Sequence, residues 1–243
     1  SCLSSEFDLS ALREYTVEAG RPDTITYEKL LVLASHGVGR ISVNPQTMRD
    51  SVLNAIGRKH SARDILDAIA TVRKFPNFSV NMDLIAGLYN DDYEGFRDSL
   101  IKILELSPEN ITVHTLSRKR GAALVSEGLL LPDAAEVGKM LDFANRSLNE
   151  AGYSPYYLYR QKFMSGNFEN IGWTSSGFHN LYNICIMEEL CSIISLGAGA
   201  STKLVSGNGR MERFINAKYP TEYIGGVDKI CSEKERIISH YGV

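Results

Sequence analysis

The amino-acid sequence predicts an α/β protein whose sheet is built from parallel strands. Strand-like and helix-like segments alternate through the first half of the 243-residue chain, and successive strand starts lie 26, 39 and 32 residues apart. This spacing matches the length of one strand–helix unit, and the alternation is typical of parallel strands joined by right-handed helical crossovers. The four predicted strands cover residues 13–18, 39–43, 78–85 and 110–116.

Capping signals predict the helices between these strands. Three apolar-periodic segments follow short polar side chains of the kind that cap helix N-termini, and a fourth follows a proline suited to a first helical turn. These residues are Thr26, Ser61 (with Asp64 as a capping box), Asp92 and Pro132. Gly37 and Gly152 follow the first and the last of these segments, and we expect them to end the helices.

The composition changes after about residue 152, where tyrosines cluster and Gly, Ser and Asn turns become frequent. We therefore predict a repeat of strand–helix units over residues 1–152 and a mixed α/β C-terminal region over residues 153–243. A capping box formed by Ser232 and Glu235 predicts that the last helix begins near Ser232.

Composition and charge exclude several classes of protein. The chain is 44% hydrophobic and 23% charged with a net charge of −3, which is an ordinary globular balance and too mild for nucleic-acid binding by bulk charge. It shows neither a membrane-spanning apolar run nor a signal peptide, so the sequence predicts a cytoplasmic protein without a membrane partner. Cys185 and Cys191 fit no common metal or redox spacing, and we predict no metal site within this chain.

Polar residues stand where the predicted strands end. In parallel strand–helix barrels the reactive groups lie at the carboxyl ends of the strands. The four strands deliver Glu18, Gln46, Asp83 and Ser117 there, the last followed by a basic run through residue 120. Asp83 interrupts an otherwise apolar strand, and a buried carboxylate is costly unless it is paired or hydrogen-bonded. Taken singly, Asp83 and Glu18 are better explained as structural carboxylates than as ligand contacts.

Two further features allow both a structural and a functional interpretation. Arg58 precedes a predicted helix, where it is either a solvated loop residue or a fork for a ligand carboxylate. Gly197 and Gly199 form either a tight turn or a place where a flat ligand approaches the backbone. His60, His114 and His179 show no metal-ligand spacing, and the sequence predicts structural roles for them.

Six ordered segments, spread over nearly the whole chain, resemble the oxygen-independent coproporphyrinogen III oxidase family, and in particular its coproporphyrinogen dehydrogenase branch. Members of this family are radical S-adenosylmethionine (SAM) enzymes. The segments are REYTVEAGRPDTIT, GVGRISVNPQTM, IGRKHSARD, VNMDLIAGL, PYYLYRQK and YNICIMEELCSIISLGAGASTK.

The resemblance implies a partial parallel (β/α) barrel of the radical SAM type, with strands three to six of six present, followed by the mixed C-terminal region of the family. The family holds a 4Fe–4S cluster through C-x3-C-x2-C after its first strand and cradles SAM with G-G-x-P-T, and neither motif occurs here. The sequence therefore resembles the C-terminal portion of a longer enzyme whose cluster ligands lie in a missing N-terminal part.

The remaining family motifs match residue by residue, and they imply a SAM site. Glu18 and Gln46 match family residues that contact SAM, Arg58 matches the arginine that pairs with the SAM carboxylate, and Asp83 matches the aspartate near the SAM ribose. Ser117 and Ser201 match positions where the family backbone approaches the adenosyl group. The turn after Asp83, usually G-L-P-G in the family, is Gly-Leu-Tyr-Asn here.

The resemblance implies a radical SAM oxidoreductase of anaerobic porphyrin and heme biosynthesis that oxidatively decarboxylates the propionates of a porphyrinogen. The basic run after Ser117 and the tyrosine cluster are candidates for contacts with substrate carboxylates. We expect this chain alone to be inactive because it lacks the cluster motif. Two alternatives stay open: a heme-binding or heme-delivery protein on the same scaffold, and an inactive truncated product. The heme chaperones of the sister group carry H-N-x-x-Y-W, whose last two aromatics are lacking in residues 179–184.

Overall fold

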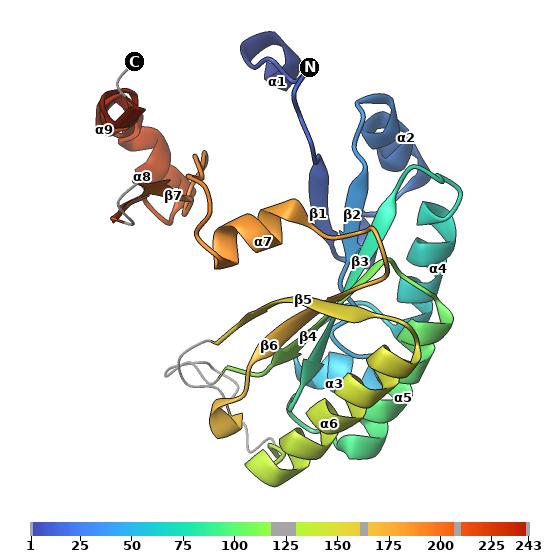
Figure 1. The fold of residues 1–243 in the computed structure, drawn as a ribbon. Helices are drawn as coiled ribbons and strands as arrows, with labels where there is room; N and C mark the ends of the chain where they lie inside the picture. Colours follow the sequence, from blue (N-terminus) through green and yellow to red (C-terminus); the bar gives the residue numbers. More distant parts are fainter. Residues whose placement is uncertain (1, 118–129, 161–164, 207–209, 242–243) are drawn as a thin grey trace. The chain divides into compact units, whose positions relative to one another are not determined.

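The computed structural model describes residues 2–117, 130–160, 165–206 and 210–241 (Figure 1). The chain divides into two compact units, Ser1–Asn180 and Leu181–Val243. The boundary predicted after residue 152 separates the strand–helix units from the mixed C-terminal region, and it stays a prediction. The basic run at 118–120 lies outside the described residues.

The first unit contains one six-stranded sheet in the order β1-β2-β3-β4-β6-β5. The strands β1 to β4 are parallel to one another, as predicted, whereas β6 runs antiparallel to both β4 and β5. The bounds are β1 Thr16–Gly20, β2 Arg40–Val43, β3 Ser79–Ala86, β4 Asn110–Thr115, β5 Ser154–Tyr159 and β6 Asn170–Thr174. The four predicted strands therefore form one continuous parallel sheet, and two strands after residue 152 extend it.

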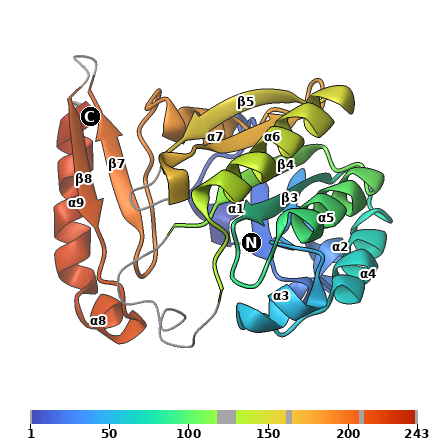
Figure 2. The same ribbon diagram turned by 90° about the horizontal axis from the view of Figure 1, so that it is seen from below.

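Helices follow the parallel strands and cover one face of the sheet (Figures 1 and 2). Their bounds are α2 Tyr27–Ser35, α3 Asp50–Ala55, α4 Ala62–Val72, α5 Tyr93–Glu105 and α6 Ala134–Glu150, with a short α1 at Cys2–Glu6 and 3-10 turns η1 at Pro22–Thr24 and η3 at Ser165–Asn167. Three predicted caps are confirmed: Thr26 accepts from the Lys29 amide, Ser61 and Asp64 form the complete capping box, and Asp92 accepts from the Gly95 amide.

Two predicted helix starts are wrong. The helix α6 begins at Ala134, capped by Asp133, so Pro132 lies before its first turn. The last helix, α9, runs from Val227 to Tyr241 and therefore begins five residues before Ser232. The Ser232 hydroxyl donates to the Asp228 carbonyl at 3.2 Å, which is a bond within the helix and not a cap.

The second unit, described by itself, is a small α/β arrangement. It contains α7 Leu181–Met187, the antiparallel hairpin of β7 Ser201–Val205 and β8 Met211–Ile215, α8 Pro220–Gly225 and α9. Lys203 of the hairpin forms an ion pair of 2.9 Å with Glu189. Within the described parts of both units, no helix combines the length and the apolar content needed to cross a membrane.

The sheet of the first unit has one apolar face and one polar face because side chains alternate along each strand. The apolar face packs under α2, α4, α5 and α6 and forms the core. Its fully buried members include Ile41, Val80, Met82, Leu84 and Ile111. The polar face lies on the opposite side of the same strands.

A buried arginine closes the polar face at the amino ends of the strands. The Arg40 guanidinium donates to the carbonyl oxygens of Phe178 and His179, at 3.0 and 3.2 Å, and to the side chain of Asn110. Its Nε lies 3.7 Å from the Glu14 carboxylate. We call this group, with Glu14, Asn110 and the two carbonyls, the Arg40 clamp. The clamp holds the segment after β6 against the amino ends of β2 and β4.

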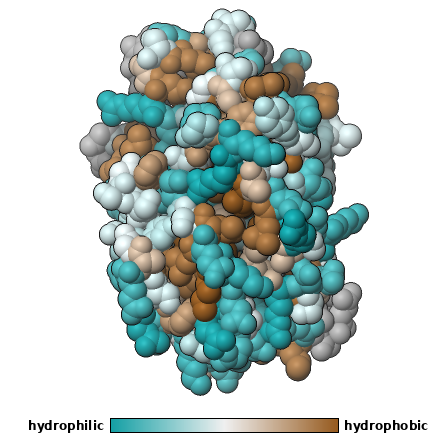
Figure 3. Space-filling model, turned by 90° about the vertical axis from the view of Figure 1, so that its right-hand side faces the viewer, coloured by the Kyte–Doolittle hydropathy of each residue, from teal (hydrophilic) through white to brown (hydrophobic). Residues whose placement is uncertain are grey.

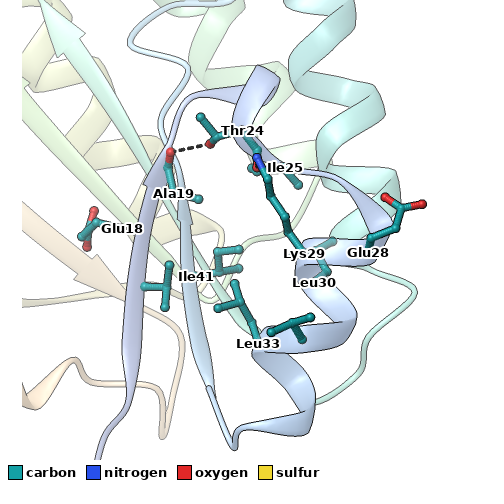
Figure 4. Close-up of a pocket in the computed structure, with 11 residues that line it drawn as sticks. Glu18, Ala19, Thr24, Ile25, Glu28, Lys29, Leu30, Leu33 and Ile41 are labelled. Carbon is teal, nitrogen blue, oxygen red and sulfur yellow. Dashed lines mark hydrogen bonds between the residues drawn. The ribbon is translucent and has the colours of Figure 1, made fainter. Parts of the chain in front are cut away.

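An apolar groove of about 580 Å³ lies between β1 and α2 at the edge of the sheet. Figure 4 shows Leu30, Leu33 and Ile41 around this space, with Glu18 on the other side of β1. Two large side chains of α2, Leu31 and Val32, are more than half exposed, and Figure 3 shows apolar patches among polar side chains on the side of the molecule where the helices lie. Because β1 is the edge strand and an apolar groove adjoins it, this edge favours association.

We therefore expect the chain to form oligomers in solution through this edge. Replacing Val32 by glutamate places a charge at the groove and is expected to shift the chain toward the monomer, as measured by light scattering. The control is Val227→Glu, an exposed apolar position on α9. A wild-type chain that is monomeric and melts cooperatively would contradict this prediction.

A buried carboxylate lies in the turn after β3. The Asp91 side chain is 1% exposed and lies 3.5 Å from the Arg49 guanidinium. Burial raises the pKa of Asp91 from 3.8 to about 6, against the opposing effects of the Asp92 amide and Arg49. Folding therefore favours the protonated form of the Asp91 side chain.

We expect Asp91→Asn to stabilise the protein above pH 6. The folded state binds the Asp91 proton more tightly than the unfolded state. The stabilisation that this proton gives the folded state is complete below about pH 3.8 and is lost as the pH rises through about 6. Asparagine carries no charge, and the melting temperature should rise by about 2–4 °C at pH 7.5 and change little at pH 4. The exposed control Asp98→Asn should show no such difference between the two pH values. An equal effect of Asp91→Asn at both would refute the assignment.

Candidate cofactor-binding site

The polar face of the sheet carries two of the six sequence-predicted site residues, Glu18 and Asp83. Strand register places Glu18 opposite Ser42, Ser42 opposite Asn81, and Asp83 opposite Thr112. The residues that share this face are Glu18, Ser42, Asn81, Asp83, Asn110, Thr112, His114, Tyr157 and Tyr159. A face this polar on a sheet interior is unusual for a purely structural surface and typical of a site that meets a ligand.

Two carboxylates influence each other on this face. The protein atoms around Glu18 remove part of its hydration and raise its pKa, and the negative charge of Asp83 raises it further. Asp83 is partly buried, and its Oδ1 accepts a hydrogen bond of 2.9 Å from the Asn81 amide. The pair therefore forms an acidic surface that favours donors, such as hydroxyl or ammonium groups, over anions.

One acceptor beside these carboxylates lacks a partner. The side-chain oxygen of Asn44, just after β2, is buried and has no hydrogen-bond partner among the described residues. The Asn44 amide is bonded to the Gly20 carbonyl at 3.2 Å, so the residue lies where β1 ends. A buried acceptor of this kind calls for a donor from a ligand or from water. Asn44, Glu18 and Asp83 therefore all offer acceptors for the donor groups of a ligand.

Gln46 reaches the site through an unusual backbone conformation. Its φ of 67° lies in the left-handed region, which non-glycine residues seldom adopt. Its amide donates to the Asp83 carbonyl and its own carbonyl accepts from the Ile85 amide, both at 2.9 Å. With Ser117 and His114 it lines a cleft of about 270 Å³ at the carboxyl ends of β3 and β4. The structure thus places Gln46 and Ser117 in one cleft and bonds the backbone of Gln46 to that of Asp83.

Of the other two predicted residues, Arg58 belongs to the loop between α3 and α4 and Ser201 to the second unit. Arg58 is half-buried between α3 and α4, where its amide donates to the Leu53 carbonyl and its charge helps to lower the pKa of His60, which is lowered mainly by burial. Ser201 is the exposed first residue of β7 in the second unit. Its relation to the polar face stays a prediction.

The sequence did not point to His114. Its Nε2 lies 3.6 Å from Asp83 Oδ2, and its Nδ1 lies 3.3 Å from the Tyr159 hydroxyl. Metal-ligand spacing gives no signal for this residue, whereas strand alternation does: Asn110, Thr112 and His114 fall on one face of β4. His114 is therefore part of the site.

The tyrosine cluster divides between two environments. Tyr157 and Tyr159 stack on the polar face with ring centroids 6.3 Å apart, and burial raises the pKa of Tyr157. Tyr153 donates instead to the Pro108 carbonyl at 2.5 Å and is buried beside the core. Of these three residues, only Tyr157 and Tyr159 are placed to meet a ligand on the polar face.

The described residues do not fit an iron–sulfur cluster. A 4Fe–4S cluster is held by several clustered cysteine thiolates. In the part of the chain that the structure describes, no group of three or more His, Cys, Asp or Glu side chains could hold a metal ion. That the cluster ligands lie outside this chain stays a prediction.

Comparison with protein families identifies one matching model. The model of the radical SAM superfamily matches residues 9–100, which include β1 to β3 and most of α5. Among curated proteins, the chain is 42% identical over 230 residues to the oxygen-independent coproporphyrinogen-III oxidase-like protein HemZ of Bacillus subtilis, covering 93% of this chain and 46% of HemZ. It is 27% identical to the heme chaperone HemW of Haemophilus influenzae, covering 92% of this chain and 55% of HemW.

Comparison with solved structures matches the same fold. Coproporphyrinogen III oxidase (HemN) of Escherichia coli, a radical SAM enzyme, superposes with a TM-score of 0.70 at 18% sequence identity. The match covers 93% of this chain and 51% of HemN. The chain thus spans about half the length of the relatives it matches, and the predicted fold class is confirmed as a mostly parallel α/β sheet of this type.

Proposed function

The chain belongs to the radical SAM superfamily, and from this premise we propose that it is part of an oxidoreductase that oxidatively decarboxylates the propionate side chains of a porphyrinogen. The observation that carries this proposal is the 42% identity to a coproporphyrinogen-III oxidase-like protein over 93% of the chain. The acidic polar face supports it, because its carboxylates and the unpaired Asn44 acceptor suit SAM.

We assign the SAM contacts to the side chains of Glu18, Gln46, Arg58 and Asp83. The carboxylates and the Gln46 amide would accept or donate hydrogen bonds to the ribose and ammonium groups, and Arg58 would pair with the carboxylate of SAM. The backbones at Ser117 and Ser201 would approach the adenosyl group. When bound beside a reduced 4Fe–4S cluster, SAM supplies radical chemistry at unactivated C–H bonds. The protein then orients both reactants and keeps water away from them.

The reaction is tested with the protein expressed from its complete gene. We expect anaerobic incubation with SAM, a reductant, an electron acceptor and coproporphyrinogen III to yield porphyrinogens lighter by one and two carboxyl groups, detected by mass spectrometry. Cleavage of SAM without decarboxylation would refute the substrate assignment. Absence of SAM binding by calorimetry would refute the proposal at its first step.

A heme-delivery function is the second candidate, because heme chaperones are 27–28% identical to the chain over most of its length. On this reading the polar face would still bind SAM, but the larger ligand would be heme. Titration with hemin separates the two functions. A saturable Soret band with one heme per chain favours the chaperone, and its absence together with decarboxylation favours the oxidoreductase.

A further inference from the structure

We infer that His114 is a positioning residue that holds the Asp83 carboxylate ready for the hydroxyl groups of a ligand. This inference rests on the proposed SAM site, in which Asp83 contacts the ribose, and it adds two residues to that site. His114 lies on β4, the strand next to β3, and Tyr159 lies on β5, the edge strand beyond β6. Its hydroxyl nevertheless reaches His114 Nδ1 at 3.3 Å.

The contacts of His114 favour one of the two tautomers of its ring. An ionised carboxylate only accepts hydrogen bonds, so the imidazole nitrogen that faces it carries a hydrogen. Nε2 faces Asp83 Oδ2 at 3.6 Å, which leaves Nδ1 of the neutral ring as an acceptor. The Tyr159 hydroxyl lies 3.3 Å from Nδ1 and donates to it. At 3.6 Å this contact is longer than a hydrogen bond, and it acts through the electrostatic attraction between the ring N–H and the carboxylate.

A second chain of side chains holds the other oxygen of Asp83. The Asn81 amide donates to Asp83 Oδ1 at 2.9 Å, and Thr112 donates to the Asn81 side-chain oxygen at 3.4 Å. Thr112 in turn lies 3.3 Å from the Tyr157 hydroxyl. The two oxygens of Asp83 are therefore restrained from two sides, through chains that end at Tyr157 and Tyr159. This arrangement fixes the rotamer of the carboxylate before a ligand arrives, which lowers the entropy lost on binding.

The surroundings define the class of ligand. Asp83 and Glu18 act on the same face, so an anionic ligand group is disfavoured there. The adjoining cleft of about 270 Å³ is lined by His114 and Tyr159 together with Gln46 and Asn170. These side chains offer hydrogen bonds without net charge when His114 is neutral. The arrangement fits the vicinal hydroxyls of a ribose better than a phosphate or a carboxylate.

The inference is tested by calorimetric titration of SAM into three variants, each checked by its thermal melt. We expect His114→Phe, which keeps a planar ring but no hydrogen bonds, to weaken SAM binding about tenfold. Tyr159→Phe removes the donor to Nδ1 and should weaken it about threefold. His114→Gln keeps an amide donor within reach of Asp83 and should stay within about threefold of wild type. The control is His36→Phe on the exposed end of α2, which should leave SAM affinity unchanged.

A spectroscopic measurement separates positioning from a structural role. Imidazole ¹⁵N shifts of the folded protein should report hydrogen on Nε2 of His114, and Tyr159→Phe should reduce this preference without lowering the melting temperature. Wild-type SAM affinity in both His114→Phe and Tyr159→Phe would overturn the inference, while loss of affinity in Asp83→Asn alone would leave the proposed SAM site standing. Absence of SAM binding by the wild-type chain would refute both. Should His114→Phe fail to fold, His114→Gln and Tyr159→Phe decide the question.

Discussion

Replacement of Arg40 by methionine is expected to lower the free energy of unfolding by about 3–5 kcal/mol, the range found when one partner of a buried charged group is removed. Arg40 is 6% exposed and donates to two backbone carbonyls and to Asn110. Methionine preserves much of the volume but donates no hydrogen bond. The His179 carbonyl would lose its Arg40 donor and the Glu14 carboxylate its ion pair, whereas the Phe178 carbonyl would keep only the hydrogen bond of 3.0 Å from the Asn110 amide.

Urea denaturation followed by circular dichroism measures this loss. The matched control is Arg63→Met on α4, where the arginine is 78% exposed and its ion pair with Asp67 spans one helical turn. Exposed pairs of this kind contribute about 0.3–0.5 kcal/mol. Losses of similar size for Arg40 and Arg63 would show that the Arg40 clamp is not a stabilising element.

The second large effect is expected on SAM binding. If Arg58 pairs with the SAM carboxylate through its planar fork, lysine does not reproduce the geometry, and Arg58→Lys should weaken binding by about one to two powers of ten. Asp83→Asn is nearly isosteric and keeps a side chain that can bond to Asn81 and His114. If Asp83 contacts the ribose, this change should reduce SAM affinity more than it reduces thermal stability.

Calorimetry of SAM binding, compared with the thermal melts of both variants, decides between a ligand contact and a structural role. For a structural Asp83 the order reverses, so that the melting temperature falls while the folded fraction still binds SAM. Asp67→Asn on the exposed side of α4 is the control for removing a carboxylate. Unchanged SAM affinity in both Arg58→Lys and Asp83→Asn would refute the assignment of these residues.

Local signals in the sequence predicted the elements whose stability is local. Thr26, Ser61 with Asp64, and Asp92 cap their helices as expected, because a cap depends on the next three residues alone. The sequence did not predict β5 and β6, because β6 joins the sheet through its pairing with the distant strand β4. Pro155 and Gly172 also weaken the strand pattern, although Gly172 is needed where the Tyr157 ring lies directly against the backbone.

The candidate site also contains both residues that a local sequence signal indicates and residues that only the fold brings together. Asp83 stood out in the sequence because a carboxylate in an apolar strand needs a reason, and the structure gives it partners from β3 and β4. Its partnership with His114 depends on the register between those strands, which no single segment reveals. The assignments of Arg58 and Ser201 came from family resemblance, and they depend on a ligand that joins separate parts of the chain.

The Arg40 clamp also makes the two ends of the polar face different. It seals the amino ends of the strands with a bonded peptide segment, whereas the cleft beside Gln46 and Ser117 opens at the carboxyl ends. We therefore expect a ligand to approach this face of the sheet from the carboxyl ends of the strands.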